Sequence, residues 1–125
     1  MSAKRGDLAR LQEIHDVIQE TRAQMREIGF TEERFLRPEN AQDDLIAEGI
    51  LNRVLRITEE AGHLSGEIAK EYGFDQQGVL GVRNRLAHAY GEVDREIIWS
   101  VIVQDFDELL DSCARYCADN NIELE

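Results

Sequence analysis

The sequence predicts an all-α protein, an antiparallel helical bundle of about four main helices plus a short one. Apolar residues recur with the helical period of about 3.6 along most of the chain. No segment alternates with period two, as a half-buried strand would. The chain has 125 residues and one proline, which suits one domain with its own core. We therefore expect residues 1–125 to form a single helical domain, with a short polar tail from about residue 119.

The first helix is expected to run from Asp7 to a stop at Gly29. Thr31 is a favourable N-cap and is followed by acidic residues, so a short helix should run through residues 35–36 until Pro38 interrupts it. The apolar face of the first helix has helical spacing throughout and consists of Leu8, Leu11, Ile14, Ile18, Met25 and Ile28.

A second long helix should begin near Pro38 or Asn40 and end where Gly73 can act as a C-terminal cap. At more than about thirty residues, this helix is expected to bend near Gly62 or Gly66. Its apolar stripe is formed by Leu45, Ile46, Ile50, Val54, Leu55, Ile57, Ala61, Leu64 and Ile68.

A shorter helix should follow the loop at 74–78 and close at Gly91, and Asp94 should then cap the last helix. The predicted stripe of the last helix consists of Ile97, Ile98, Val101, Ile102, Phe106, Leu109 and Leu110. This helix is apolar on more than one face, because Trp99 and Val103 stand among the aliphatic residues of its first half. A second apolar face suggests a homodimer interface. The alternative is a central helix packed on all sides.

Charge and composition exclude several classes of protein. The formal net charge of −12 argues against a broad basic surface for nucleic acid, so any RNA contact must be local. The longest apolar run, at 97–103, is far shorter than the roughly 20 residues that cross a bilayer. The N-terminal MSAKRGD lacks an apolar signal core. We expect a soluble, cytoplasmic protein without membrane contact.

The two cysteines, Cys113 and Cys117, stand four apart in a helical segment. Two thiols alone do not complete a tetrahedral metal site. Two reduced cysteines in a helix are therefore a simpler interpretation than a disulfide or a metal-binding pair. We expect no metal and no cofactor.

The residues best suited to chemistry stand together in RNRLAHAY at 83–90. Arg83 is a permanent planar cation, and His88 can exchange protons near neutral pH. RNA cleavage without a metal needs a base for the 2′-hydroxyl, an acid for the leaving oxygen and a cation beside the phosphate. Arg83 and His88 supply most of these groups, and a dimer would supply two of each.

Helical geometry does not place these two side chains on one face. Residues five apart point about 140° away from each other, whereas Asn84 and Arg85 project on the side of His88. Either of them could orient the imidazole or contact the phosphate. From the residues alone, the simpler interpretation is a capped helix end with solvated arginines and His88 at the negative end of the helix dipole.

The motif as a whole, Arg83, four residues, His88, one residue and Tyr90, resembles the signature of HEPN-domain proteins, and more closely their HepT toxin branch. The similarity covers roughly residues 7–112 and includes TEERFL, ITEEAGHLS and VDREIIWSVIVQDFDELL. It implies a helical bundle that dimerises with two motifs facing one cleft. It also implies a metal-independent endoribonuclease that acts as the toxin of a type VII-like toxin–antitoxin pair.

The resemblance assigns roles to individual residues. In that family the arginine and histidine of the motif form the catalytic pair, here Arg83 and His88. The tyrosine, here Tyr90, is adenylylated by the cognate antitoxin, a minimal nucleotidyltransferase. A bulky anionic nucleotide at this position would block the cleft and repel an RNA phosphate.

Some assignments stay open. Relatives commonly have Gly-Glu where this chain has Thr58-Glu59, so Glu59 is either a supporting residue or a solvated one, and His63 is expected at the surface. The acidity could offer a face to a basic antitoxin, or simply keep the bundle soluble. The alternative function is a non-catalytic HEPN dimer that serves as binding partner and modification target of a nucleotidyltransferase. A plain dimerisation bundle is the third possibility.

Overall fold

A computed structural model describes the backbone of residues 5–88 and 94–122, and the side chains of residues 6–82 and 94–122. Every regular element in these residues is helical, which confirms the predicted all-α fold. The elements in chain order are α1 (Arg5–Glu27), α2 (Glu32–Leu36), α3 (Ala41–Gly62), α4 (Gly66–Tyr72), α5 (Gln76–His88), α6 (Arg95–Ser100), the π-helical turn η1 (Val101–Asp105) and α7 (Phe106–Asn120).

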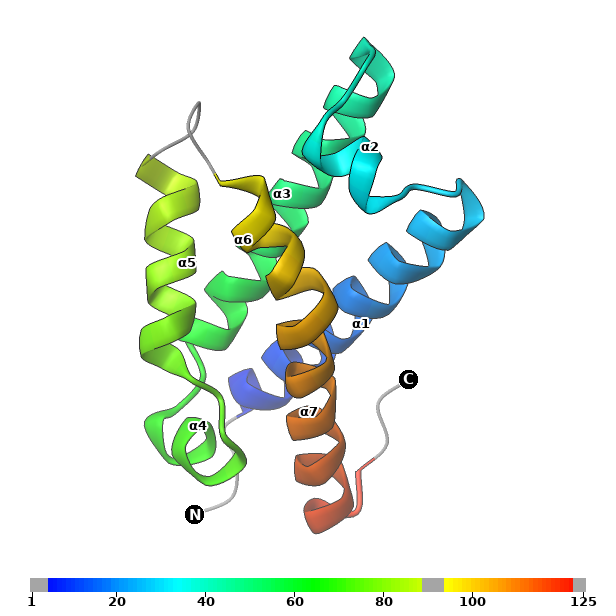
Figure 1. Cartoon of the computed structure of the whole chain (residues 1–125). Helices are drawn as coiled ribbons and strands as arrows, with labels where there is room; N and C mark the ends of the chain where they lie inside the picture. The colour runs from blue at the N-terminus through cyan, green and yellow to red at the C-terminus, as the bar shows by residue number, and fades with distance from the viewer. Residues whose placement is uncertain (1–4, 89–93, 123–125) are drawn as a thin grey trace.

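The long helices α1 and α3 run in opposite directions and pack against each other (Figure 1). α5 packs on α3, and α6, η1 and α7 follow one continuous path that crosses the bundle and ends against α1 and α4. The core is continuous between these helices. Its largest fully buried side chains are Phe35, Phe106, Leu11, Ile14, Ile18, Ile57 and Ile98.

The predicted caps Thr31, Gly73 and Asp94 are confirmed, and Asn40, near which the second long helix is predicted to begin, is an N-cap as well. Thr31 and Asn40 accept hydrogen bonds from the backbone N–H three residues ahead, at 3.3 and 2.8 Å. The Asp94 carboxylate accepts from two N–H groups of α6. Gly73 ends α4 in the left-handed conformation, with φ of +77°. Each cap satisfies backbone groups that a helix end leaves free.

Three residues of the predicted core stripes are instead exposed, namely Ile28, Leu45 and Ile97. Leu45 is 72% exposed, because it lies two residues, or about 200° of helix rotation, before the buried Ala47 and so faces outward. Ile28 is 49% exposed and lies just beyond the end of α1. The stripes otherwise agree with the core.

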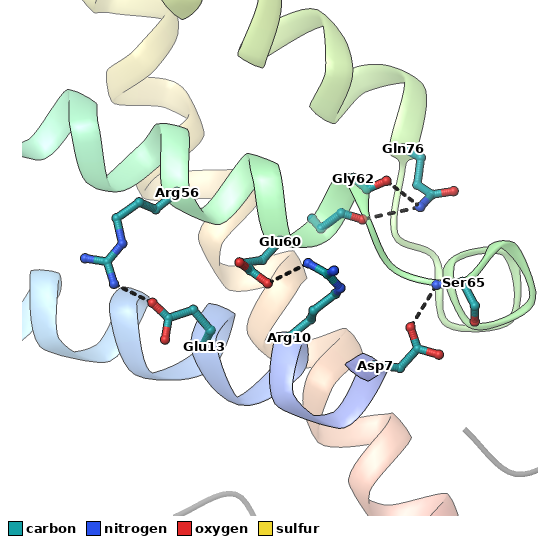
Figure 2. A network of polar contacts seen from close by, with 9 residues as sticks. Asp7, Arg10, Glu13, Arg56, Glu60, Gly62, Ser65 and Gln76 are labelled. Atoms are coloured by element: carbon teal, nitrogen blue, oxygen red, sulfur yellow. Dashed lines mark hydrogen bonds and ion pairs between the residues drawn. The ribbon is translucent and has the colours of Figure 1, made fainter. Parts of the chain in front are cut away.

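The prediction of a single bent helix between Asn40 and Gly73 is wrong, because α3 ends at Gly62 and a separate helix, α4, begins at Gly66. Side chains from distant segments stabilise the break between α3 and α4 by hydrogen bonds to its backbone. Gln76 donates to three carbonyl groups around the end of α3, the shortest of these bonds being 2.9 Å to Leu64. Figure 2 shows Gln76 bound to Gly62 at the end of α3, and Ser65, whose backbone N–H donates to the Asp7 carboxylate at 2.9 Å.

Ion pairs connect α1 to the second half of α3 along the same face (Figure 2). Arg10 pairs with Glu60 at 3.1 Å, and Arg56 pairs with Glu13. These pairs are part-exposed, so each adds little stability, about 0–1 kcal/mol. They fix the register of α1 against α3.

The last predicted helix contains an interruption that the sequence pattern did not indicate. η1 has π-helical hydrogen bonding, which rotates the following turns relative to a regular α-helix. Ile98, Val101, Ile102 and Phe106 remain in the core, whereas Ile97 and Val103 are 39% and 44% exposed. α7 also continues to Asn120, past the predicted start of the polar tail.

Cys113 and Cys117 are both free, in agreement with the two reduced helix cysteines that the sequence predicts, and both are buried. Between residues 5 and 88 and between 94 and 122, no helix has the length and apolar character needed to cross a bilayer.

Candidate functional site

The motif residues 83–88 form the second half of α5. Arg83, Asn84, Arg85 and His88 therefore occupy one short helix, as the sequence predicts. Their side chains lie outside the described residues, as does the whole of Tyr90. The convergence of Arg83 with His88, and the position of the Tyr90 hydroxyl, thus stay predictions.

The beginning of α5 is firmly anchored. The Asp75 carboxylate accepts from Gly78 N at 3.0 Å, and a Cβ at Gly78 would lie only 2.5 Å from the other oxygen of that carboxylate. Gln76 at the same end binds the carbonyl groups at the end of α3. These contacts fix where the helix starts, and therefore how far along α3 the motif lies.

The segment that follows the motif is anchored at its other end, at the start of α6. Arg95 donates to the Phe35 carbonyl oxygen at 2.9 Å and to the Asp44 carboxylate at 3.1 Å. The same guanidinium lies 5.7 Å from the centre of the Phe35 ring. Along the chain, the motif thus lies between two anchored points. The start of α5 is tied to the end of α3, and the start of α6 is tied to α2 and α3.

A cleft of about 320 Å³ lies between α3, α5 and the path from α6 to α7. Most of its lining is aliphatic. α3 contributes Val54, Ile57, Thr58 and Ala61, α5 contributes Val79 and Val82, and the last helices contribute Ile97, Val101, Phe106 and Leu109. Val82 immediately precedes Arg83, so the lining of the cleft includes the residue next to the motif in the chain.

One end of this cleft is acidic. Asp75, Asp105 and Glu108 all line it. Burial raises the pKa of Asp105, and the neighbouring charges of Glu108 and Asp75 raise it further. Since Asp75 precedes the start of α5 and Arg83 is seven residues past Gln76, about 10 Å of helix separates the acidic end from the motif. An anionic ligand is therefore disfavoured at the acidic end of the cleft.

Glu59, the sequence-predicted supporting residue, is exposed on α3. The neighbouring Thr58 lines the cleft instead, is 5% exposed, and donates its hydroxyl proton to the Leu55 carbonyl oxygen at 2.8 Å. His63 is exposed, as predicted. His15, for which the sequence indicates no partner, has its Nδ1 atom 3.1 Å from the Asp16 carboxylate.

Sequence reasoning missed Gln76 and Thr58 as residues that shape the cleft. No local pattern marks Gln76, because its partners lie 12 to 15 residues away in the sequence. Thr58 could have been found from the α3 stripe, since it follows Val54 by one helical turn. In the described part of the chain, no group of three or more His, Cys, Asp or Glu side chains is arranged to hold a metal ion.

Comparison with known families decides what kind of protein carries this cleft. The sequence profile of the family described as "Ribonuclease HepT-like" matches residues 11–116. The chain belongs to the HepT-like ribonuclease family. The match spans the bundle from within α1 to within α7 and includes the RNRLAHAY motif.

This membership confirms the resemblance drawn from the motif, and it associates the HepT-like chain with ribonuclease activity of the HEPN toxin class. Neither the curated proteins nor the solved structures that were compared include a match.

Proposed function

We propose that this HepT-like protein is the toxin of a type VII-like toxin–antitoxin pair and cleaves RNA in the cytoplasm as a metal-independent endoribonuclease. The observation that carries the proposal is the motif at 83–90, beginning on α5 next to a cleft, in a chain that matches the ribonuclease family over 11–116. The homodimer, the nucleotidyltransferase antitoxin and the roles of the motif residues are parts of the same proposal.

In the proposed reaction the 2′-hydroxyl oxygen attacks the adjacent phosphorus and the bond to the 5′-oxygen breaks. His88 accepts the 2′-hydroxyl proton or donates one to the leaving oxygen, and a second His88, from the other copy, performs the complementary transfer. Arg83 stabilises the negative charge that gathers on the phosphorane oxygens. The products are a 2′,3′-cyclic phosphate and a free 5′-hydroxyl.

Asn84 and Arg85 act as supports in this proposal. Both stand three or four residues before His88, so a regular α5 places them on its side of the helix. Asn84 orients the imidazole, and Arg85 adds a phosphate contact. Glu59 lies on the outer surface of α3, so a supporting role for it requires that the second copy approach that surface.

A homodimer supplies what one copy lacks. The roughly 140° offset between Arg83 and His88 on a regular helix leaves them unable to share one face, whereas two antiparallel copies of α5 bring one arginine near the other histidine. Leu80 on α5 and Ile97 on α6 are 48% and 39% exposed, which provides apolar surface beside the motif. We therefore place the interface on this side of the bundle.

The first test measures cleavage of total cellular RNA in the presence of EDTA. Arg83→Ala and His88→Ala should each lower the cleavage rate by about 10² to 10⁴, the usual contribution of a positioned acid or base, and should remove growth inhibition. Arg37→Ala and His63→Ala are matched controls, because both residues are exposed and lie on other elements. Unchanged cleavage in both motif variants would refute the catalytic assignment.

The second test concerns control of the toxin. With ATP and its cognate minimal nucleotidyltransferase, the protein should gain nucleotide mass and lose cleavage, because an anionic nucleotide in the cleft repels RNA phosphate. Tyr90→Phe should cleave RNA but resist this silencing. If mass spectrometry finds the modification unchanged in Tyr90→Phe, the assignment of Tyr90 fails.

The alternative function is a non-catalytic HEPN dimer that binds the nucleotidyltransferase and serves as its modification target. The same two experiments distinguish it. Purified protein that cleaves no RNA under any condition, yet gains nucleotide on Tyr90, would favour the binding module over the ribonuclease.

A further inference from the structure

A second depression lies between α1 and α7, apart from the cleft beside the motif. It is a shallow groove of about 820 Å³ and is lined by residues of both helices and by Ile122. The two depressions share one lining residue, Glu108, at their common edge. We call this depression the α1/α7 groove.

The floor of the α1/α7 groove is apolar. Leu110, Ala114 and Ala118 follow each other at intervals of four residues, so they form one strip along α7, and Cys117 and Ile122 extend it. The two alanines are exposed. Small side chains allow another helix to approach closely, and the 15 residues of α7 provide about 22 Å of length, or roughly four helical turns.

The rim of the groove carries charge of one sign. Asp107, Glu108 and Asp111 line it and are all exposed. Asp107 pairs with Arg22 at 2.7 Å, whereas among the described residues no ion pair involves Glu108 or Asp111. Within this part of the chain no lysine or arginine lines the groove, and His15 is its single basic side chain.

The charges decide which occupant fits. A second copy of this chain would bring the same acidic rim and a formal charge of −12 against the first, so a self-association here is repulsive. RNA and anionic lipid are repelled for the same reason. A lysine- or arginine-rich helix with one apolar face complements both the floor and the rim, in the helix-in-groove mode of recognition.

We propose that the α1/α7 groove binds a basic amphipathic helix of a partner protein. The apolar face of that helix packs on Leu110, Ala114 and Ala118, and its cations lie against Glu108 and Asp111. This site does not use Arg83 or His88, so the proposal stands whether or not the protein cleaves RNA.

The test uses a fluorescently labelled peptide of about 14 residues, roughly four turns, composed of leucine and lysine with helical periodicity. It should bind the full chain in low salt. A peptide of the same composition with scrambled order keeps the charge but has no apolar face, so it should bind clearly more weakly. Equal binding of the two peptides would indicate charge attraction alone and would overturn the proposal.

Paired variants locate the binding site. Glu108→Gln with Asp111→Asn should weaken binding on the order of fivefold or more, since two exposed ion pairs are lost. Glu67→Gln with Glu71→Gln makes the same change of charge on exposed positions of α4 and should leave affinity within about twofold. Equal losses in the two double variants would contradict the assignment to this groove.

A third pair tests the floor. Ala114→Trp fills the strip where the peptide should pack and should reduce its affinity, whereas Ala23→Trp, at an exposed position of α1 outside the groove, should not. Circular dichroism confirms that each variant is folded. Undiminished binding to Ala114→Trp would place the peptide elsewhere and refute the proposal.

Discussion

Cys113 illustrates how strongly burial in this core changes the pKa of a single side chain. Its side chain is fully buried, and its thiol lies 3.9 Å from the Leu11 carbonyl oxygen, to which it donates. Burial raises the pKa of this thiol to about 12, with a smaller contribution from the neighbouring Cys117. Because the folded pKa is above that of a free thiol, the folded state favours the neutral form.

The stability of the protein should therefore fall in alkaline solution. The contribution of Cys113 is complete below pH 9.0, the ordinary thiol value, and is lost as the pH rises towards about 12. Through Cys113, the free energy of unfolding falls by at most about 1.4 kcal/mol per pH unit. Urea unfolding from pH 7 to 11 should show a shallower decline for Cys113→Ala than for the unchanged chain. Equal slopes would contradict this.

Part of the alkaline decline should persist in Cys113→Ala. Burial is also the leading cause that raises the pKa of Tyr72, Tyr116 and Cys117. These groups act in the same direction, since each is neutral when protonated.

At the scale of the elements, helix ends determine the path of the chain. Gly73 has φ of +77° and ends α4 with its N–H donating to the Ala69 carbonyl oxygen. A side chain at such φ is strained, although the nearest atom to an added Cβ, in Arg115, would be 3.5 Å away. Gly49, in the middle of α3, has open space around it.

These two glycines should respond to alanine in opposite directions. Gly73→Ala should lower the free energy of unfolding by about 1–2 kcal/mol, because alanine is unfavourable in the left-handed region. Gly49→Ala should raise it by about 0.5–1 kcal/mol, because alanine favours a helix interior. Chemical denaturation of both variants measures this. Changes of the same sign would show that the local conformations are not the cause.

At the scale of the whole molecule, the proposed homodimer requires an apolar surface beside the motif. α5 packs on α3, and its Leu80 is 48% exposed. Such an apolar surface supports the proposal that a dimer assembles the site from two chains. By contrast, Leu45 is 72% exposed near the beginning of α3, at a distance along the chain from the motif.

We expect sedimentation to show a dimer of the 14.3 kDa chain. Leu80→Glu should shift it to monomers and abolish RNA cleavage, because a charge in an apolar interface must be desolvated. Leu45→Glu makes the same substitution on the more exposed leucine and should preserve both the dimer and cleavage. A Leu80→Glu monomer that cleaves RNA at the full rate would contradict the shared site.

Much of the fold was predictable because its signals are local. Thr31, Asn40 and Asp94 act as caps in the structure as their residue types predict, and the stripes of α1 and α3 supply most of the core. The π turn at 101–105 was not predictable, because an aliphatic run such as IIWSVIV fits an α-helix equally well. The exposed positions of Leu45 and Ile28 depend on which face the neighbouring helices cover.

The sequence by itself determined the helical class, the capped helix ends and the motif that places the chain among the HepT-like ribonucleases. Tertiary structure alone decided the break between α3 and α4, where Asp7 and Gln76 bind backbone groups 58 and 12 residues away. It likewise decided that Asp75, Asp105 and Glu108 meet at one end of the cleft. The physical reason is the separation in sequence between the interacting residues. A cap and an apolar stripe depend on residues within a few helical turns, whereas these contacts exist only once distant helices have packed.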